Sequence, residues 1–169
     1  MYSLFDINDK VIVITGGTGV LGTSMVEYLA AHGAKVAVLA RNIEKGNRLI
    51  DKVKADGGDA IFLQTDVTNE EVLQQNADAI ANHYGRIDVL INGAGGNMPG
   101  ATIGPDSTIF DLKSADFRKV VDLNLMGTVL PTLAFAKQMM KEKKGSIVNV
   151  SSASALRPLT RVAGYGAAK

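Results

Sequence analysis

Five short apolar runs alternate along the chain with longer segments in which apolar residues recur every three or four positions. The β-branched run at residues 11–14 is typical of a strand buried on both faces of a sheet. Strands that alternate with amphipathic helices at this spacing predict an α/β fold with a parallel sheet. We therefore expect one doubly wound, Rossmann-type domain over residues 1–169, with a layer of helices on each side of the sheet. The expected strands lie at residues 11–14, 35–39, 60–64, 87–91 and 147–150.

Helical periodicity follows each of the first three strands. The sequence predicts a helix from Val20 to about His32, closed by a glycine that suits a C-cap. A second helix begins after Asn42, which can cap it, and extends to about Asp56. The third predicted helix begins with a capping box at residues 68–71 and carries an apolar stripe. The members of that stripe are Leu73, Ala77, Ile80 and Tyr84.

A long helix is predicted from Asp116, with a kink at Pro131. Asn124 lies within its apolar face, where a buried polar group needs a partner. Before this helix, residues 97–111 show no clear periodicity and predict a loop at the mouth of a site. The apolar face consists of Phe117, Val120, Val121, Leu125, Thr128, Thr132, Phe135 and Met139.

A glycine-rich turn at residues 15–22 joins the first strand to the first helix. Gly17, Gly19 and Gly22 follow the G-x-G-x-x-G pattern in the strand–turn–helix setting that the pattern requires. Without Cβ atoms, such a turn brings backbone amides and the helix N-terminus close to a pyrophosphate. A P-loop would need a lysine after Gly22, where Thr23 stands. The remaining alternative is a tight turn without a ligand.

Two charged residues at strand ends bear on the nature of the cofactor. An acidic residue after the second strand would hold an adenosine ribose hydroxyl, but positions 39–43 contain no Asp or Glu. Arg41 stands there instead, which suits a 2′-phosphate, and the alternative is a solvated surface arginine. Asp66, after the third strand, could accept a hydrogen bond from an adenine amino group, although a loop or capping role fits equally well.

A second glycine cluster ends the fourth strand. Its three glycines, within residues 92–97, indicate close backbone approach beside the first turn. In an open α/β sheet, ligands bind at the carboxyl ends of the strands. We therefore expect the two glycine clusters to line one crevice.

Ser152, Tyr165 and Lys169 form the third candidate group. Tyr165 and Lys169 are four residues apart and would share one face of a helix. Tyrosine phenols ionise with a pKa of about 10, and a fixed ammonium nearby favours the phenolate. Ser152 follows the fifth strand, so its hydroxyl would emerge at the ligand-binding edge. A Tyr-x-x-x-Lys pair is more often a surface helix pair, so this group needs support from the rest of the chain.

The composition is that of an ordinary globular protein, with 46% apolar and 21% charged residues among 169. A net charge of +1 argues against a nucleic-acid or membrane surface built on bulk charge. The chain has no cysteine, and His32 and His83 are isolated, so we expect no metal site. Residues 1–10 lack the apolar core of a signal peptide, and no apolar run is expected to approach a membrane span. The cytoplasm is the expected location.

Together these residues resemble the N-terminal two-thirds of a classical short-chain dehydrogenase/reductase, and the resemblance covers the whole chain. The turn at residues 15–22 is similar to that family's cofactor turn, and residues 92–95 are similar to its Asn-Asn-Ala-Gly motif. Asn124 matches its active-site asparagine, and Ser152 precedes Tyr165 by the family's usual spacing. The resemblance assigns cofactor contacts to Gly16, Thr18, Gly19, Val20, Leu21, Gly22, Arg41, Asp66, Val67, Asn92, Ala94, Gly95, Tyr165 and Lys169.

The resemblance implies an oxidoreductase that interconverts a carbonyl and an alcohol, with NADP, or else NAD, as cofactor. Tyr165 would donate the proton, and Lys169 would assist the tyrosine and hold the nicotinamide ribose. Ser152 would orient the carbonyl, and Asn124 would hold a water that relays protons. The alternative is a dinucleotide-binding module without catalysis, or an inactive fragment.

Three further expectations come from the resemblance. The glycines after the fourth strand are similar to those of a subgroup that reduces sugar acids of the fructuronate or mannonate kind. Related enzymes pair through the long helix, so we expect a homo-oligomer, a dimer or tetramer, with Leu130, Leu133 and Met140 at the contact. Family members usually continue with two more strands and a substrate lobe. We therefore expect the chain to be truncated after Lys169, with the C-terminal part of the sheet missing.

Overall fold

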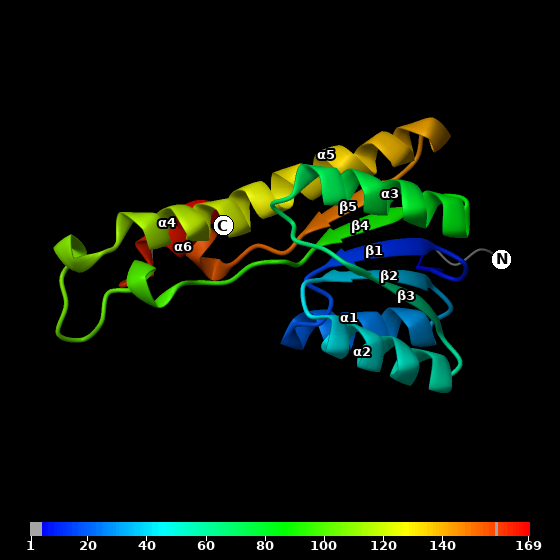
Figure 1. Cartoon of the computed structure of the whole chain (residues 1–169), viewed down its shortest axis with the longest axis horizontal. Coiled ribbons are helices and arrows are strands. Elements are labelled where there is room, and N and C mark those ends of the chain that lie inside the picture. Colours follow the sequence, from blue (N-terminus) through cyan, green and yellow to red (C-terminus); the bar gives the residue numbers. More distant parts are fainter. Residues whose placement is uncertain (1–4, 158) are drawn as a thin grey trace.

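The computed structural model describes residues 5–157 and 159–169, which fold around one parallel sheet (Figure 1). Residues 1–4, part of the stretch expected to lack a signal peptide, lie outside the described residues. The strands are β1 (Val11–Thr15), β2 (Lys35–Ala40), β3 (Asp59–Gln64), β4 (Val89–Asn92) and β5 (Ser146–Asn149). They lie in the order β3-β2-β1-β4-β5, and each neighbouring pair is parallel. This order confirms the doubly wound α/β sheet that the sequence predicted.

Helices connect the strands and cover both faces of the sheet. They are α1 (Val20–Ala31), α2 (Ile43–Ala55), α3 (Glu70–Tyr84), α4 (Ser114–Val121), α5 (Gly127–Met139) and α6 (Ala163–Ala168). α1 and α2 pack on one face, and α3 and α5 pack on the other (Figure 1). α4 and α6 lie against each other in an arm that extends past the carboxyl ends of the strands. Within the predicted loop at residues 97–111, short 3₁₀ turns form at Pro99–Ala101 and Ile109–Asp111.

The core has two layers because β1 directs alternate side chains to opposite faces of the sheet. Val11 and Val13 pack with α3 and α5, whereas Ile12 and Ile14 pack with α1 and α2. All four side chains are buried, as their uninterrupted apolar run predicted. β1 is thereby fixed on both faces, and the glycine-rich turn that follows it starts from a well-packed strand end.

Asparagine side chains cap α2 and α3. Asn42 Oδ1 accepts the Lys45 N–H at 2.8 Å, which confirms the predicted cap of α2. At the start of α3 the predicted capping box is wrong, because Asn69 rather than Thr68 is the cap. Thr68 donates its hydroxyl to Asp66 instead, at 2.7 Å. The carboxylate at the end of β3 takes the hydroxyl that the sequence pattern had assigned to the helix.

The predicted long helix is divided by a π-turn at Asp122–Met126, between α4 and α5. A π-turn adds a residue to the helical turn and so rotates the residues around the helix axis. Leu125, which was predicted on the buried face, is consequently 46% exposed. Asn124 is buried, in agreement with its predicted place in the apolar face. α5 continues through Pro131, so the irregularity lies upstream of the predicted kink.

The helical stretch Ser114–Glu142 is long and apolar enough to cross a membrane, judged by length and composition alone. The expectation that no apolar run approaches a membrane span is therefore wrong. Core helices of globular proteins pass the same test. Phe135 and Met139 of this stretch are buried in the core layer that also contains Val11 and Val13.

β5 forms one edge of the described sheet and pairs there with β4. Its residues are exposed, including Ile147 at 38% and Val148 at 47%. An edge strand of this kind presents unpaired backbone groups on its outer side. β5 therefore leaves one edge of the described sheet open.

Candidate active site

The turn between β1 and α1 meets the segment after β4 at the carboxyl ends of the strands. β1 lies between β2 and β4, so the strand order changes direction there, which is where doubly wound sheets bind ligands. Gly16 has a φ of +70° and donates its N–H to Leu39 O at 2.8 Å. A Cβ at Gly16 would lie 2.8 Å from the Ala94 Cα. Only glycine therefore allows these two segments to approach so closely.

Thr15 joins the same two segments with its side chain, a role that the sequence analysis missed. Its Oγ1 accepts the Gly93 N–H at 3.1 Å and the Ala94 N–H at 3.2 Å. The side chain is fully buried. A polar residue at the end of the buried apolar run at residues 11–14 needs partners, and that was the available signal. One hydroxyl thus orients two backbone amides of the segment after β4.

A cleft with a volume of about 570 Å³ opens between these segments and the ends of β2 and β3. Most residues that were assigned to cofactor contact line it. They are Gly16, Thr18, Gly19, Arg41, Asp66, Val67, Ala94 and Gly95. The two glycine clusters therefore line one cleft, as expected.

Six other residues assigned to cofactor contact lie outside this lining, among them Tyr165 and Lys169 at α6. Val20 and Leu21 are exposed at the start of α1, 90% and 69% respectively. Gly22 is buried, and a Cβ there would collide with the Gly16 carbonyl oxygen. Asn92 is buried at the end of β4. Gly22 and Asn92 therefore shape the cleft from beneath its surface.

The residues present fit a dinucleotide cofactor. At one end of the cleft, α1 begins at Val20, and its N-cap residue Gly19 offers no side chain to cap the first turn. Its first amides therefore remain available to a pyrophosphate, and the helix dipole favours an anion there. Because the neighbouring wall is glycine backbone, a ligand can approach it closely.

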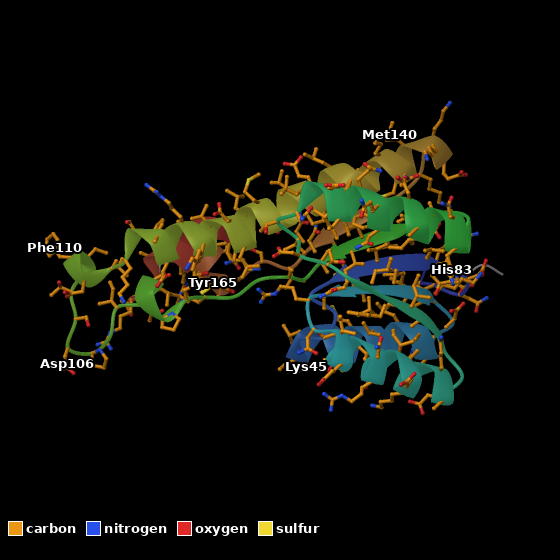
Figure 2. All side chains as sticks on the ribbon, in the orientation of Figure 1. Lys45, His83, Asp106, Phe110, Met140 and Tyr165 are labelled. Carbon is orange, nitrogen blue, oxygen red and sulfur yellow. The ribbon has the colours of Figure 1, made fainter. Side chains whose placement is uncertain are left out.

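Cations and a carboxylate stand at the other end of the cleft. Arg41, directly after β2, and Lys45, in the first turn of α2, both line it. Figure 2 shows Lys45 at the end of α2 that lies nearest the arm carrying Tyr165. The sequence analysis did not single out Lys45, and its position four residues after Arg41 was the available signal. Arg41 thus stands within residues 39–43, where an acid would have been needed to hold a ribose hydroxyl, and Lys45 adds a second cation to the lining.

Asp66 uses one carboxylate oxygen in the turn before α3. Its Oδ1 accepts the Thr68 hydroxyl at 2.7 Å and the Thr68 N–H at 2.9 Å. These bonds, with a smaller contribution from the charge of Arg41, lower the pKa of the Asp66 carboxyl. Asp66 is therefore an ionised acceptor at neutral pH. Asp66 thus has the loop role that the sequence analysis considered as an alternative. Because both bonds use Oδ1, Oδ2 is left for a ligand.

Asn124 binds the segment after β4 through both ends of its carboxamide. Its Nδ2 donates to Gly96 O at 2.7 Å and to Val120 O at 2.8 Å. Its Oδ1 accepts the Gly96 N–H at 3.1 Å. Because both Nδ2 hydrogens are used, this carboxamide could bind a water only as an acceptor. The bonds fix the cleft wall to the π-turn.

Tyr165 and Lys169 lie one turn apart at α6, as their spacing predicted. The Lys169 Nζ lies 6.0 Å from the centroid of the Tyr165 ring. It also donates to Val150 O at 2.8 Å, just after β5. Burial lowers the pKa of the Lys169 ammonium. The ammonium thus lies between the Tyr165 ring and the backbone just after β5.

Ser152 follows β5 and begins the 3₁₀ turn at Ala153–Ala155. Its Oγ accepts the Ser154 N–H at 3.2 Å. The hydroxyl proton is therefore still available to a ligand, because this bond uses only a lone pair of Oγ. Ser152 lies after the carboxyl end of its strand, where the sequence predicted it.

Gly95 connects the cleft to the candidate catalytic residues. It lines the cleft, and a Cβ built on it would lie 2.7 Å from Asn124 Oδ1 and 3.1 Å from Lys169 Nζ. Asn124 and Lys169, 45 positions apart in the sequence, therefore flank the same glycine. The end of the cleft at Gly95 thus lies next to candidate residues for proton transfer.

Known proteins share this sequence and this fold. An uncharacterised oxidoreductase of Bacillus subtilis, UxuB, is 39% identical over 168 residues, which are 95% of this chain and 60% of that protein. A protein of Haemophilus influenzae that is provisionally named a D-mannonate oxidoreductase, and whose structure contains NAD, is 35% identical. Its structure matches with a TM-score of 0.90 over 96% of this chain and 62% of that chain.

A third structure, a metagenomic short-chain oxidoreductase in complex with NADP, is 29% identical with a TM-score of 0.86. The match covers 97% of this chain and 72% of that chain. The chain therefore spans about 60% of the length of the first curated relative that it matches. The sequence model of the short chain dehydrogenase family matches residues 10–169, which include the glycine-rich turn, Asn124 and the Tyr165–Lys169 pair. The chain belongs to the short-chain dehydrogenase family.

Proposed function

We propose that this chain carries the cofactor site and the catalytic residues of a cytoplasmic, NAD(P)-dependent oxidoreductase that interconverts a carbonyl and an alcohol. The position of Gly95 is the observation that carries the proposal. Gly95 lines the cleft, and Asn124 and Lys169 flank it. A dinucleotide that fills the cleft would therefore end beside the residues that can handle a proton.

Each candidate residue has a distinct part in the proposed reaction. A nicotinamide bound in the cleft would supply the hydride for the carbonyl carbon. Tyr165 donates its hydroxyl proton to the carbonyl oxygen, as a general acid. The Lys169 ammonium, 6.0 Å from the ring centroid, stabilises the phenolate that remains. Ser152 holds the same carbonyl oxygen with its free hydroxyl proton.

The competing function is a dinucleotide-binding module without catalysis. Both functions require cofactor binding, so only turnover separates them. The experiment incubates the protein, as its gene encodes it, with NADPH or NADH and a panel of aldehydes, ketones and keto sugars. Carbonyl-dependent loss of absorbance at the reduced nicotinamide band is expected. Tight cofactor binding with no turnover on any member of the panel would favour the non-catalytic module.

We propose NADP as the preferred cofactor. Arg41 and Lys45 bring two cations to the end of the cleft that would receive the adenosine ribose. A 2′-phosphate would gain charge-assisted hydrogen bonds there, whereas an unphosphorylated ribose finds no acid at positions 39–43. Dissociation constants for NADPH and NADH, measured by titration, test this preference.

We propose a sugar acid such as fructuronate or mannonate as the substrate. The support is the resemblance of the glycine segment after β4 and the provisional name of the Haemophilus influenzae protein, which refers to D-mannonate. The test compares kcat/KM for fructuronate with that for fructose, which lacks the carboxylate. Preference for the neutral sugar would contradict the proposed class.

We also propose that α5 contributes to a homo-oligomer, a dimer or a tetramer. Leu133 lies in α5 and Met140 directly follows it, and their side chains are 65% and 70% exposed in the single chain. Exposed apolar side chains of this kind are candidates for a subunit contact. Leu130, which was expected at the contact, packs instead against the core layer of α3 and α5. Sedimentation at micromolar concentration should give a dimer or tetramer, and Leu133→Glu should shift it toward the monomer.

A further inference from the structure

The strap of chain from Asn92 to Gly96 forms one wall of the cleft, and its two ends are bound by the helical segment that follows the loop. Gly93, Ala94 and Gly95, in the middle of the strap, line the cleft. At the far end, Gly96 is held by the Asn124 carboxamide. At the near end, the Asn92 Nδ2 donates to Thr132 Oγ1 at 3.0 Å. The strap is therefore hydrogen-bonded to α5 at one end and to the preceding π-turn at the other.

The hydroxyls of two threonines form further hydrogen bonds in the stretch of helix between Asn124 and Thr132. Thr128 Oγ1 donates to Asn124 O at 2.9 Å, and Thr132 Oγ1 donates to Thr128 O at 2.8 Å. Thr132 has then spent its only hydroxyl proton, so it can only accept from Asn92. The direction of every bond in the series is thus fixed, from Asn92 through Thr132 and Thr128 to the backbone of Asn124.

The backbone of this stretch is irregular at two places, which gives the threonines a reason to be there. The π-turn at Asp122–Met126 departs from the α-helical bond pattern. Pro131 lies within α5 and has no N–H to donate to the carbonyl of Gly127. Side-chain hydroxyls add bonds where the backbone ladder is weakened. A threonine bonded in this way bends a helix slightly and brings no stability by itself.

The network leaves one of its buried polar groups unsatisfied. Asn92 is buried, and its Nδ2 donates to Asn149 Oδ1 at 2.9 Å as well as to Thr132. Its Oδ1 has no hydrogen-bond partner among the residues that the structure describes. An orphaned buried acceptor costs free energy, so an apolar residue would serve a purely structural role better. The carboxamide instead ties the end of β4 to β5 and to α5 together.

We propose that Thr128 and Thr132 are positioning residues, which hold Asn124 and the strap Asn92–Gly96 in the geometry that the cofactor and the reaction need. This inference rests on the proposed function for its effect on catalysis. Its effect on the strap does not depend on turnover. Loss of either hydroxyl should loosen the strap, weaken cofactor binding and lower kcat, with little effect on the apparent KM for the carbonyl substrate.

The test uses Thr→Val and Thr→Ser variants at both positions, in the protein as its gene encodes it. Valine keeps the shape of threonine and removes the hydroxyl, whereas serine keeps the hydroxyl. Leu130→Ala is the matched control, because Leu130 packs against the core from the same helix and takes no part in the network. The variants are compared by the hydrogen exchange of the Gly96 amide, by cofactor titration and by steady-state kinetics.

Thr128→Val and Thr132→Val should each speed exchange of the Gly96 amide and weaken cofactor binding by about tenfold, the effect expected from one lost hydrogen bond. Each serine variant should stay within about twofold of the parent, since its hydroxyl can make the same bond. The proposal is overturned if valine and serine variants behave alike, or if Leu130→Ala speeds Gly96 exchange as much as the valine variants do. Exchange reports on the network even in a protein without turnover, so failure of the proposed function would be seen separately.

Discussion

Asn124 and Gly96 hold each other by two hydrogen bonds that run in opposite directions. The Asn124 Nδ2 donates to Gly96 O at 2.7 Å, and the Gly96 N–H donates to Asn124 Oδ1 at 3.1 Å. The side chain of Asn124 is buried, so water competes little for these bonds. These two bonds consequently connect the π-turn rigidly to the wall of the cleft.

Asn124→Ala should therefore damage both stability and cofactor binding. The substitution removes the two bonds to Gly96 and a third to Val120 O. At about 1 kcal/mol for each lost bond, with unsatisfied backbone groups left behind, the free energy of unfolding should fall by about 2–4 kcal/mol. Urea denaturation measures this loss. Gln75→Ala, which alters an exposed side chain on α3, is the control and should change stability by less than about 0.5 kcal/mol.

Gly95→Ala tests the close approach at the end of the cleft. The new Cβ would lie 2.7 Å from Asn124 Oδ1 and 3.1 Å from Lys169 Nζ, so at least one of these side chains must move. We expect a lower melting temperature and weaker cofactor binding. At the neighbouring Gly96, a Cβ would meet Leu123 at an ordinary distance of 3.7 Å. If Gly96→Ala lowered the melting temperature as much as Gly95→Ala, the crowding at Gly95 would not be the cause.

Arg41→Asp should reverse the cofactor preference. The substitution removes a cation that would bind a 2′-phosphate and supplies an acid that can hold a ribose hydroxyl. A charged hydrogen bond contributes about 1.5–3 kcal/mol, so NADPH binding should weaken by at least about tenfold while NADH binding improves. Lys45→Ala should weaken NADPH binding without improving NADH binding. Tighter binding of NADH than NADPH by the parent protein would contradict the argument from Arg41.

The buried Lys169 should leave a signature in the pH dependence of stability. Burial lowers the pKa of this ammonium from 10.5, so the folded chain binds fewer protons than the unfolded chain in the alkaline range below 10.5. Stability contributed by this group therefore rises with pH over that window. Lys169→Met cannot titrate there. The difference in unfolding free energy, parent minus variant, should increase between neutral pH and 10.5, and a flat or falling difference would show that the ammonium is not desolvated.

Regular features of the fold were predictable because single residues or short patterns decide them. The buried run of β1, the Asn42 cap and the glycine that follows α1, Gly33 with a φ of +83°, depend on local chemistry. The cleft between the two glycine clusters was also predictable, since the parallel topology brings strand ends together. The spacing of Tyr165 and Lys169 placed them on one helical turn for the same local reason.

The features that could not be predicted depend on partners distant in the sequence. Thr15 has its role because Gly93 and Ala94, in the segment after β4, present amides to it. Thr68 fails to cap α3 because Asp66 takes its hydroxyl. The π-turn that exposes Leu125 has no marker in the sequence, since an inserted helical residue leaves the apolar composition unchanged. Local periodicity cannot anticipate such tertiary choices.

The most direct test of the account is Tyr165→Phe in the protein as its gene encodes it. The substitution removes the hydroxyl that donates the proton and keeps the ring beside Lys169. General acid catalysis contributes about 10²–10⁴-fold, so kcat for carbonyl reduction should fall by at least about 10²-fold. The dissociation constant for NADPH, measured by titration, should stay within about threefold of the parent, because the cleft is intact. Turnover within a few-fold of the parent would contradict the account and assign the proton to another residue.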